Sequence, residues 1–203
     1  MTDEEMIYIM RKPCYYTGKM DACGFNGLDR LDSSKGYHID NVVSCQSAVN
    51  YAKVCSDPVS FVEQVLCIHT FRATGEVVFP ESFGKPMKVS SLRAYFHRDK
   101  NRDRECKISK EKHKQLEQGE FKCDYTGLVA TSWDRIDTTL PYSDENIQPV
   151  VGVVNLMRHK LTIAEFDQLI ADVVEHVTKS GLYEKLVSMD IPRCPEKKVR
   201  RVN

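Results

Sequence analysis

The pattern of apolar and polar residues predicts a fixed order of short helices and strands over the first third of the chain. Thr2 and Glu5 have the spacing of a capping box, which places the start of a helix just before the apolar residues of 6–10. Alternating apolar and charged residues predict strands, and apolar residues on one helical face predict helices. The expected elements are a helix ending before Pro13, strands over 27–32 and 40–43, and helices over 47–53 and 60–67.

Residues 107–180 are expected to repeat this order. A polar helix over 109–118 precedes a turn, a strand, a loop and helices over 153–159 and 162–180. The residues between the two parts include a β-forming stretch at 76–79, and they are too apolar for a simple linker, so we expect them to pack on one repeat. The pattern predicts an α+β fold: a first repeat (1–70), a partly β connecting segment (71–106), a second repeat (107–180) and a C-terminal tail (181–203).

The two repeats share polar residues at a constant offset of 105 positions, and no gap is needed from the first matched pair to the last. Polar side chains held at fixed spacing in two copies rarely arise by chance, so chemistry is expected at these positions. The matched polar pairs are 29/134, 30/135, 32/137, 37/142, 41/146 and 50/155, and the phenylalanine pair 61/166 has the same offset.

Composition describes an ordinary globular protein. Of 203 residues, 41% are hydrophobic and 29% charged, and the 29 basic and 29 acidic side chains give a formal net charge of zero. This composition excludes a disordered or fibrous chain, and no apolar run is long enough to cross a bilayer, so no membrane partner is expected. The acidic start lacks the features of a secretory signal. We therefore expect an intracellular protein (cytoplasmic, nuclear or virion-associated) whose eight cysteines are reduced thiols.

Basic residues gather in two segments. Residues 93–114 hold nine basic against four acidic side chains, and residues 193–203 hold five against one. Such segments suit contacts with phosphates, although a solvated linker and a terminal tail would have the same composition. The candidate DNA-binding residues of the first segment are Arg98, Lys100, Arg102 and Arg104.

Each repeat has the order strand, loop, strand, helix, with Asp-Arg at the end of the first strand and asparagines at the loop exit and on the next helix. The turns Cys-Tyr-Tyr-Thr-Gly at 14–18 and Cys-Asp-Tyr-Thr-Gly at 123–127 precede Asp-Arg-Leu-Asp at 29–32 and Asp-Arg-Ile-Asp at 134–137. This pattern resembles a family of zinc-free HNH (ββα-metal) endonucleases found in phages, bacteria and large DNA viruses. The resemblance covers 14–53 and 123–158, and it implies two tandem ββα-metal units.

The resemblance implies a metal-dependent endonuclease that hydrolyses phosphodiester bonds in duplex or branched DNA with Mg²⁺ or Mn²⁺. A single divalent metal needs a hard oxygen ligand, which an ionised aspartate supplies. The implied metal ligands are Asp29, Asp134, Asn50 and Asn155, the implied loop-bracing residues are Asn41 and Asn146, and the implied phosphate contacts are Lys53 and Arg158.

The chain departs from the family at the general base, which is usually a histidine directly after the metal-binding aspartate. An arginine stands there in both repeats, and its pKa is too high for a base near neutral pH. A variant of the superfamily combines this arginine with a reacting tyrosine oxygen. The candidate catalytic residues are therefore Arg30, Tyr16, Asn50, Arg135, Tyr125 and Asn155, with Asp32 and Asp137 as second choices.

Structural zinc, which many relatives bind, is not expected. Each repeat keeps one cysteine of the usual four, Cys14 or Cys123, and one cysteine cannot build a tetrahedral site. The other three positions hold Thr17, Gln46 and Val49 in the first repeat and Thr126, Val151 and Val154 in the second, and the valines are expected to fill that space with apolar side chains.

Three functions remain open. The first is a DNA endonuclease that acts through one or both repeats as an intramolecular pseudo-dimer. If only one repeat cuts, the first is favoured, because Lys35-Gly36 is replaced by Leu140-Pro141 in the second. The alternatives are a catalytically inactive HNH-derived protein that binds nucleic acid or has a structural role, and a scaffold within a larger assembly that binds RNA or protein through its basic segments.

Overall fold

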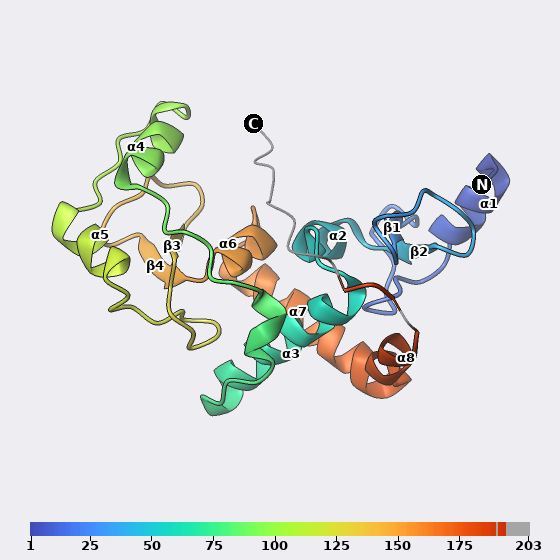
Figure 1. Cartoon of the computed structure of the whole chain (residues 1–203). Helices are drawn as coiled ribbons and strands as arrows, with labels where there is room; N and C mark the ends of the chain where they lie inside the picture. Colours follow the sequence, from blue (N-terminus) through green and yellow to red (C-terminus); the bar gives the residue numbers. More distant parts are fainter. Residues whose placement is uncertain (190, 194–203) are drawn as a thin grey trace. The chain divides into compact units, whose positions relative to one another are not determined.

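The computed structural model describes residues 1–189 and 191–193 and has an α+β fold (Figure 1). Over these residues the chain forms eight helices and two separate sheets, each an antiparallel pair of strands. The elements are α1 (Asp3–Met10), β1 (Gly27–Arg30), β2 (Val42–Cys45), α2 (Ser47–Lys53), α3 (Pro58–Thr74), a 3-10 turn (Pro80–Phe83), α4 (Leu92–Lys100), α5 (Lys110–Glu117), β3 (Ser132–Arg135), β4 (Ile147–Val150), α6 (Gly152–Arg158), α7 (Ile163–Ser180) and α8 (Leu182–Ser188).

The contacts divide the chain into two compact units. Unit 1 comprises residues 1–66 and the described residues from 168 onward, and unit 2 comprises residues 67–167. Unit 1 therefore contains residues 58–66 of α3 and residues 168–180 of α7, whereas unit 2 contains the end of α3 (67–74) and the start of α7 (163–167). Residues 71–106 fall in unit 2 with β3, β4 and α6.

A matched contact in each unit reflects this division of the long helices. In unit 1 the turn residue Gly18 lies against the ring of His176 from α7, and in unit 2 Gly127 lies against the ring of Phe71 from α3. Phe71 and His176 are 105 positions apart, the offset of the repeat. Each turn is therefore packed by the long helix of the other repeat.

The capping box predicted at the N-terminus is confirmed. The hydroxyl of Thr2 accepts a hydrogen bond from the backbone N–H of Glu5, and the Glu5 carboxylate accepts one from the N–H of Thr2. Two N–H groups that the first helical turn leaves free are thereby satisfied, which explains why α1 begins at Asp3.

The hairpins pair in equivalent registers. Asp29 of β1 stands opposite Val43, and Asp134 of β3 stands opposite Gln148. The second strand of the first hairpin begins at Val42, two residues later than predicted. The helix predicted over 60–67 is longer at both ends and becomes α3.

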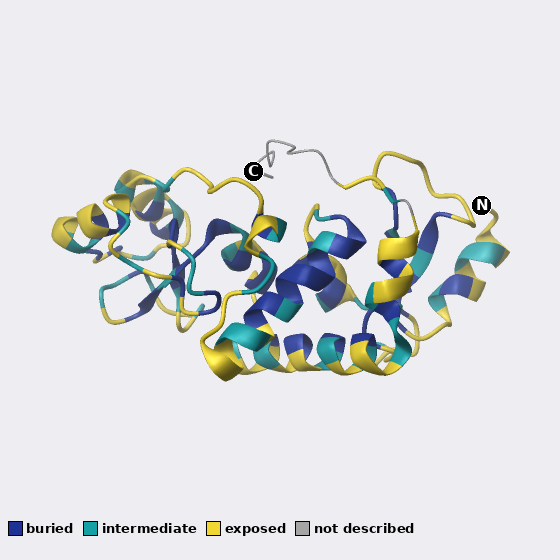
Figure 2. Cartoon of the chain, turned by 60° about the horizontal axis from the view of Figure 1, so that its bottom comes forward, coloured by how far each residue is buried: buried dark blue, intermediate teal, exposed yellow. Residues whose placement is uncertain are grey.

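Aromatic side chains connect each hairpin to a long helix. In unit 1 the ring of Tyr16 meets Phe61 edge to face with centroids 5.3 Å apart, and in unit 2 Tyr125 meets Phe166 in the same way at 5.5 Å. Both pairs belong to the buried residues, which Figure 2 separates from the exposed ones. Edge-to-face aromatic pairs add stabilisation beyond the area that they bury.

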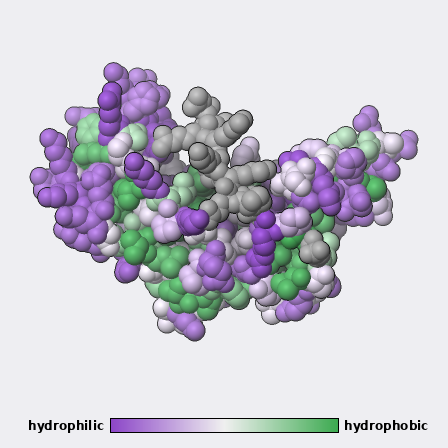
Figure 3. Space-filling view, viewed as in Figure 1, coloured by the Kyte–Doolittle hydropathy of each residue, from purple (hydrophilic) through white to green (hydrophobic). Residues whose placement is uncertain are grey.

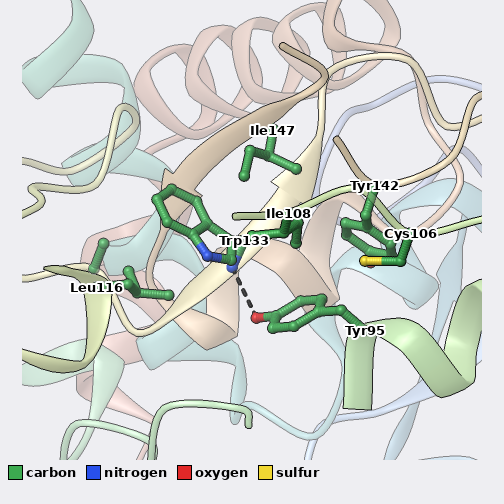
Figure 4. Packing of buried hydrophobic residues seen from close by; sticks show 8 residues of the cluster. Tyr95, Cys106, Ile108, Leu116, Trp133, Tyr142 and Ile147 are labelled. Atoms are coloured by element: carbon green, nitrogen blue, oxygen red, sulfur yellow. Dashed lines mark hydrogen bonds between the residues drawn. The ribbon is translucent and has the colours of Figure 1, made fainter. Parts of the chain in front are cut away.

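The core of unit 2 is centred on Trp133. Its backbone N–H donates to the hydroxyl of Tyr95 from α4 at 3.0 Å (Figure 4). The ring of Phe121 meets its indole at a centroid distance of 5.0 Å. The remaining buried members are Cys106, Ile108, Leu116, Ala130, Tyr142 and Ile147. The predicted connecting segment therefore contributes Tyr95 and Cys106 to this core, with Val89 and Leu92 packed against it.

Two sequence predictions need correction. Residues 76–79 form no strand: no other described segment pairs with them, and Phe79 adopts a left-handed backbone with φ of 50° before Pro80. The connecting segment is helical instead, through α4, so it is not partly β. The predicted tail begins with a helix, α8, because Leu182 and Leu186 are buried. Its basic residues from 194 onward, and Cys194, lie outside the described residues.

No helix within the described residues combines the length and the apolar character that crossing a membrane requires.

Candidate functional site

The strand alternation directs the aspartate and the arginine of each Asp-Arg pair to opposite sides of the hairpin. Asp29 and Asp134 are buried, whereas Arg30 and Arg135 are partly exposed. The helix after each hairpin then brings a basic side chain to the buried aspartate.

In unit 1 the carboxylate of Asp29 has two partners. The hydroxyl of Tyr16 donates to Oδ2 at 2.8 Å, and the ammonium of Lys53, at the end of α2, lies 3.1 Å from Oδ1. Burial raises the pKa of Tyr16 well above its ordinary value, and the nearby negative charge of Asp29 raises it further. Tyr16 is therefore a neutral hydrogen-bond donor at physiological pH.

In unit 2 the guanidinium of Arg158 occupies the same place on Asp134. Its Nη2 donates to Oδ1 of Asp134 at 2.7 Å, and its Nε donates to Oδ2. It also donates to the backbone carbonyls of Leu161 and Arg135. Burial alone would lower the pKa of Arg158, but the hydrogen bonds and charge of Asp134 outweigh this and raise it.

The surroundings of both aspartates do not fit a divalent metal. A metal would have to share carboxylate oxygens that already accept hydrogen bonds from a tyrosine and a lysine, or from an arginine in a two-point contact, and it would be repelled by that lysine or arginine. The cation within reach of each carboxylate is a side chain of the protein. Across residues 1–189 and 191–193, no three His, Cys, Asp or Glu side chains form a group that could hold a metal.

The two asparagines expected at the metal donate their amide hydrogens to the protein. Asn50 donates to the carbonyl of Leu28 at 3.3 Å, and Asn155 donates to the hydroxyl of Ser132 at 2.8 Å and to the carbonyl of Trp133 at 3.0 Å. Each asparagine thus connects the helix to the first strand of its hairpin.

Tyr125 is placed like Tyr16 but reaches its aspartate through an intermediate residue. The amide of Gln148 donates to the Tyr125 hydroxyl at 3.4 Å and to Oδ2 of Asp134 at 3.3 Å. Burial raises the pKa of Tyr125. With exposed fractions of 0% for Tyr16 and 2% for Tyr125, neither phenol is accessible to a substrate in this conformation.

The sequence pattern did not single out Gln148. The position matched to it in the first repeat is Val43, so comparison of the repeats gives no signal for a polar residue there.

The loop asparagines make identical sets of contacts. Oδ1 of Asn41 accepts from the N–H of Asp32 at 2.9 Å, and its amide donates to the carbonyls of Asp32 and Gly36. Asn146 makes the same three bonds to Asp137 and Pro141. Each asparagine thus ties the residue just before its second strand to the start and the middle of the preceding loop.

The arginines of the Asp-Arg pairs lie over tyrosines of the same loops. Arg30 sits 5.1 Å from the ring centroid of Tyr37 and donates to the Lys35 carbonyl. Arg135 sits 5.1 Å from the ring of Tyr142 and donates to the Leu140 carbonyl. Both arginines are held in place by their own loop.

The aspartates considered as second-choice bases cap these loops. Oδ1 of Asp137 accepts hydrogen bonds from the hydroxyl of Thr139 at 2.6 Å and from its backbone N–H at 2.8 Å, and these two bonds lower the pKa of Asp137. Ser34 does the same for Asp32.

Thr139→Val is expected to raise the pKa of Asp137 toward its ordinary value of 3.8, because the hydroxyl is lost while the backbone N–H remains. Folding lowers this pKa, so the resulting stabilisation is present above about pH 4 and is lost as the pH falls through the folded value. An NMR titration of the side-chain carboxyl carbon measures the shift. Ser34→Ala is the matched change for Asp32, and an unaltered pKa in both variants would contradict the assignment.

Unit 1 has a pair of buried thiols that the repeat does not indicate. Cys14 of the turn lies beside Cys45 of β2, and the position matched to Cys45 is Val150. Hydrogen bonding from Cys45, helped by Thr17 and two backbone N–H groups, lowers the pKa of Cys14 to about 6 despite its burial. In place of further cysteines, the turn is closed by a hydrogen bond from Thr17 to Gln46.

Of the basic segment, Arg98 and Arg104 are half-buried, whereas Lys100 and Arg102 are exposed. Nη1 of Arg104 donates to the carbonyls of Thr138 and Leu140 at 3.2 and 3.3 Å. The sequence placed these side chains in a separate connecting segment and did not indicate that they reach the loop after β3.

Comparison with known proteins gives little further information. No protein-family model matches the chain, and neither does any solved structure. Over 119 residues the chain is 26% identical to the uncharacterized protein R423 of Acanthamoeba polyphaga mimivirus. The matched region covers 58% of this chain and 22% of that protein, so the chain corresponds to a small part of that relative's length.

Proposed function

We propose that this protein binds nucleic acid through two HNH-derived units in which a buried ion pair has replaced the catalytic metal. The support for the HNH origin is the order of hairpin and helix in each unit, with an aspartate on the first strand and an asparagine on the following helix. DNA, duplex or branched, is the proposed partner.

The main observation that supports the loss of metal-dependent catalysis is the position of Lys53 and Arg158. Each is almost fully buried and neutralises the aspartate that the family uses as a metal ligand. A buried cation at this distance would repel a divalent ion as well as compete for the same oxygens. The neutral, buried state of Tyr16 removes the candidate for the reacting oxygen in unit 1.

Binding is supported by the basic segment. Most of the visible residues over α4 and α5 are hydrophilic in the space-filling view, with a small apolar group among them near α4 (Figure 3). Among the hydrophilic residues, Arg93, Lys100, Arg102, Lys110 and Lys114 are exposed. With a formal net charge of zero for the whole chain, such a local surface favours contact with phosphates over general adhesion to polyanions.

The proposal is tested with the full chain and a fluorescently labelled DNA duplex, a branched DNA and a supercoiled plasmid, each with and without Mg²⁺ or Mn²⁺. We expect binding that weakens steeply with salt and no cleavage with either metal. Asp29→Ala and Asp134→Ala preparations serve as the matched control for contaminating nucleases. Metal-dependent cleavage by wild type that both changes together abolish would establish a nuclease instead. Absence of DNA binding at low salt would overturn the proposal altogether.

A further inference from the structure

Two arginines from different segments of unit 2 converge on one atom. Arg135 at the end of β3 donates to the carbonyl oxygen of Leu140 at 2.9 Å, and Arg104 after α4 donates to the same oxygen at 3.3 Å. Two guanidinium groups therefore lie one hydrogen bond away from a single neutral oxygen. Like charges brought this close repel each other unless an anion joins them.

A third arginine is connected to this pair through two aromatic rings in edge-to-face contact. Arg98 of α4 lies 5.0 Å from the ring centroid of Tyr95, Tyr95 meets Tyr142 edge to face at 5.1 Å, and Arg135 lies 5.1 Å from the centroid of Tyr142. Tyr95 and Tyr142 are both buried, so these rings hold the guanidinium groups on a rigid base. We call Arg98, Arg104 and Arg135 the arginine cluster.

No carboxylate of the described residues is in direct contact with the arginine cluster, although the charge of Asp137 is close enough to interact with Arg135 and Arg104. Within the described part of the chain none of its members forms an ion pair with a carboxylate. The acidic neighbours are Asp137, which accepts hydrogen bonds from Thr139, and Asp99, whose Oδ2 accepts from the N–H of Tyr142. Arg102, which donates to the carbonyl of Arg98, adds a further positive charge.

The remaining donors of the arginine cluster suit an anion with several oxygens. A guanidinium has five N–H donors. Arg104 and Arg135 donate hydrogen bonds to described residues through Nη1 alone. The guanidinium of Arg98 donates none to a described residue. A planar fork held by stacking loses little freedom when it binds, which favours two-point recognition of phosphate.

The described residues of unit 1 form no such cluster. Arg30 lies over Tyr37 without a second arginine, and Lys35, at the position of Leu140, pairs with Asp32 at 3.4 Å. The connecting segment that supplies Arg98 and Arg104 belongs to unit 2.

We infer that the arginine cluster binds a phosphodiester of the nucleic-acid backbone and that unit 2 makes the principal backbone contact of this protein. The inference rests on the proposed function, and it changes the role of Arg135 from a candidate catalytic group to a phosphate ligand.

The test compares two triple variants of the full chain that remove the same charge. Arg98→Gln/Arg104→Gln/Arg135→Gln removes the cluster, and Lys88→Gln/Lys122→Gln/Lys160→Gln removes three exposed lysines of the same unit that lie outside the basic segment. Affinity for the labelled duplex is measured by fluorescence anisotropy over a series of salt concentrations. The cluster variant is expected to bind at least about tenfold more weakly, with a salt slope smaller by about 0.9 for each phosphate that it no longer neutralises, and the lysine variant to change much less.

Equal losses of affinity in the two variants would overturn the assignment of the arginine cluster as the phosphate site, while the proposed nucleic-acid binding would stand. Absence of binding by wild type would instead overturn the proposed function. Because Arg104 and Arg135 also brace a loop, Arg98→Gln alone provides a second test: its guanidinium donates no hydrogen bond to any described residue. We expect it to weaken binding about threefold with an unchanged melting temperature, and no change would contradict the site. A parallel titration with RNA of the same sequence identifies which polymer supplies the phosphodiester. The affinity for the true ligand is expected to fall further in the cluster variant than the affinity for the other polymer.

Discussion

Replacement of Arg158 with methionine is expected to lower the free energy of unfolding by about 3–5 kcal/mol, because it leaves the carboxylate of Asp134 buried without its counterion. Methionine keeps much of the aliphatic volume, so the cost reflects mainly the lost charge and hydrogen bonds. Urea unfolding monitored by circular dichroism and by the fluorescence of Trp133, the one tryptophan, measures it.

The control for this prediction removes both charges. Arg158→Met combined with Asp134→Asn is expected to recover at least half of the loss, since no unpaired charge stays buried. Lys53→Met, with and without Asp29→Asn, is the matched pair of variants in unit 1. A cost below about 1 kcal/mol for Arg158→Met would mean that Asp134 is solvated or binds another cation, and the proposed replacement of the metal would fail.

Gly127→Ala is expected to destabilise the protein by about 2–5 kcal/mol through two separate effects. Gly127 has a φ of +67°, and an alanine in the left-handed region costs about 1–2 kcal/mol. The new Cβ would also lie 2.9 Å from Cζ of the Phe71 ring and closer still to Cε2, and such overpacking costs a further 1–3 kcal/mol or so. Thermal and urea unfolding of the variant provide the measurement.

Gly119→Ala separates the two effects. Gly119 has a φ of +75°, but the nearest atom to an added Cβ, Cγ1 of Val129, is at an ordinary contact distance of 3.5 Å. Only the backbone cost of about 1–2 kcal/mol is expected there. Phe71→Leu should relieve part of the clash in Gly127→Ala. Equal losses in the two alanine variants would show that α3 does not pack on the turn.

The order of elements was largely predictable because it depends on local patterns. The capping box of Thr2 and Glu5 marks the start of α1, and the alternation around Asp29 and Asp134 marks the first strand of each hairpin. Residues 76–79 show the limit of such reasoning. Their β-forming side chains form a strand only where another strand is available to pair with them, and none of the described strands is.

The candidate site was predictable in its residues but not in its contacts. The repeat singled out Asp29, Asp134 and the asparagines, yet it left open whether the basic residue one turn further along the helix faces solvent or the interior. Lys53 and Arg158 turn inward because α2 and α6 pack against the first strands of their hairpins, which brings these side chains to the buried carboxylates.

The sequence by itself determined that this protein is a duplication with a hairpin and a helix in each copy, because side-chain periodicity and a constant offset of 105 positions are properties of the chain alone. Only the tertiary structure decided which charges meet: Asp29 with Lys53, Asp134 with Arg158, and Arg104 with Arg135 around one carbonyl oxygen. It also decided that α3 and α7 are each divided between the two units. Such pairings depend on the packing of segments far apart in the chain, and no local pattern of residues specifies them.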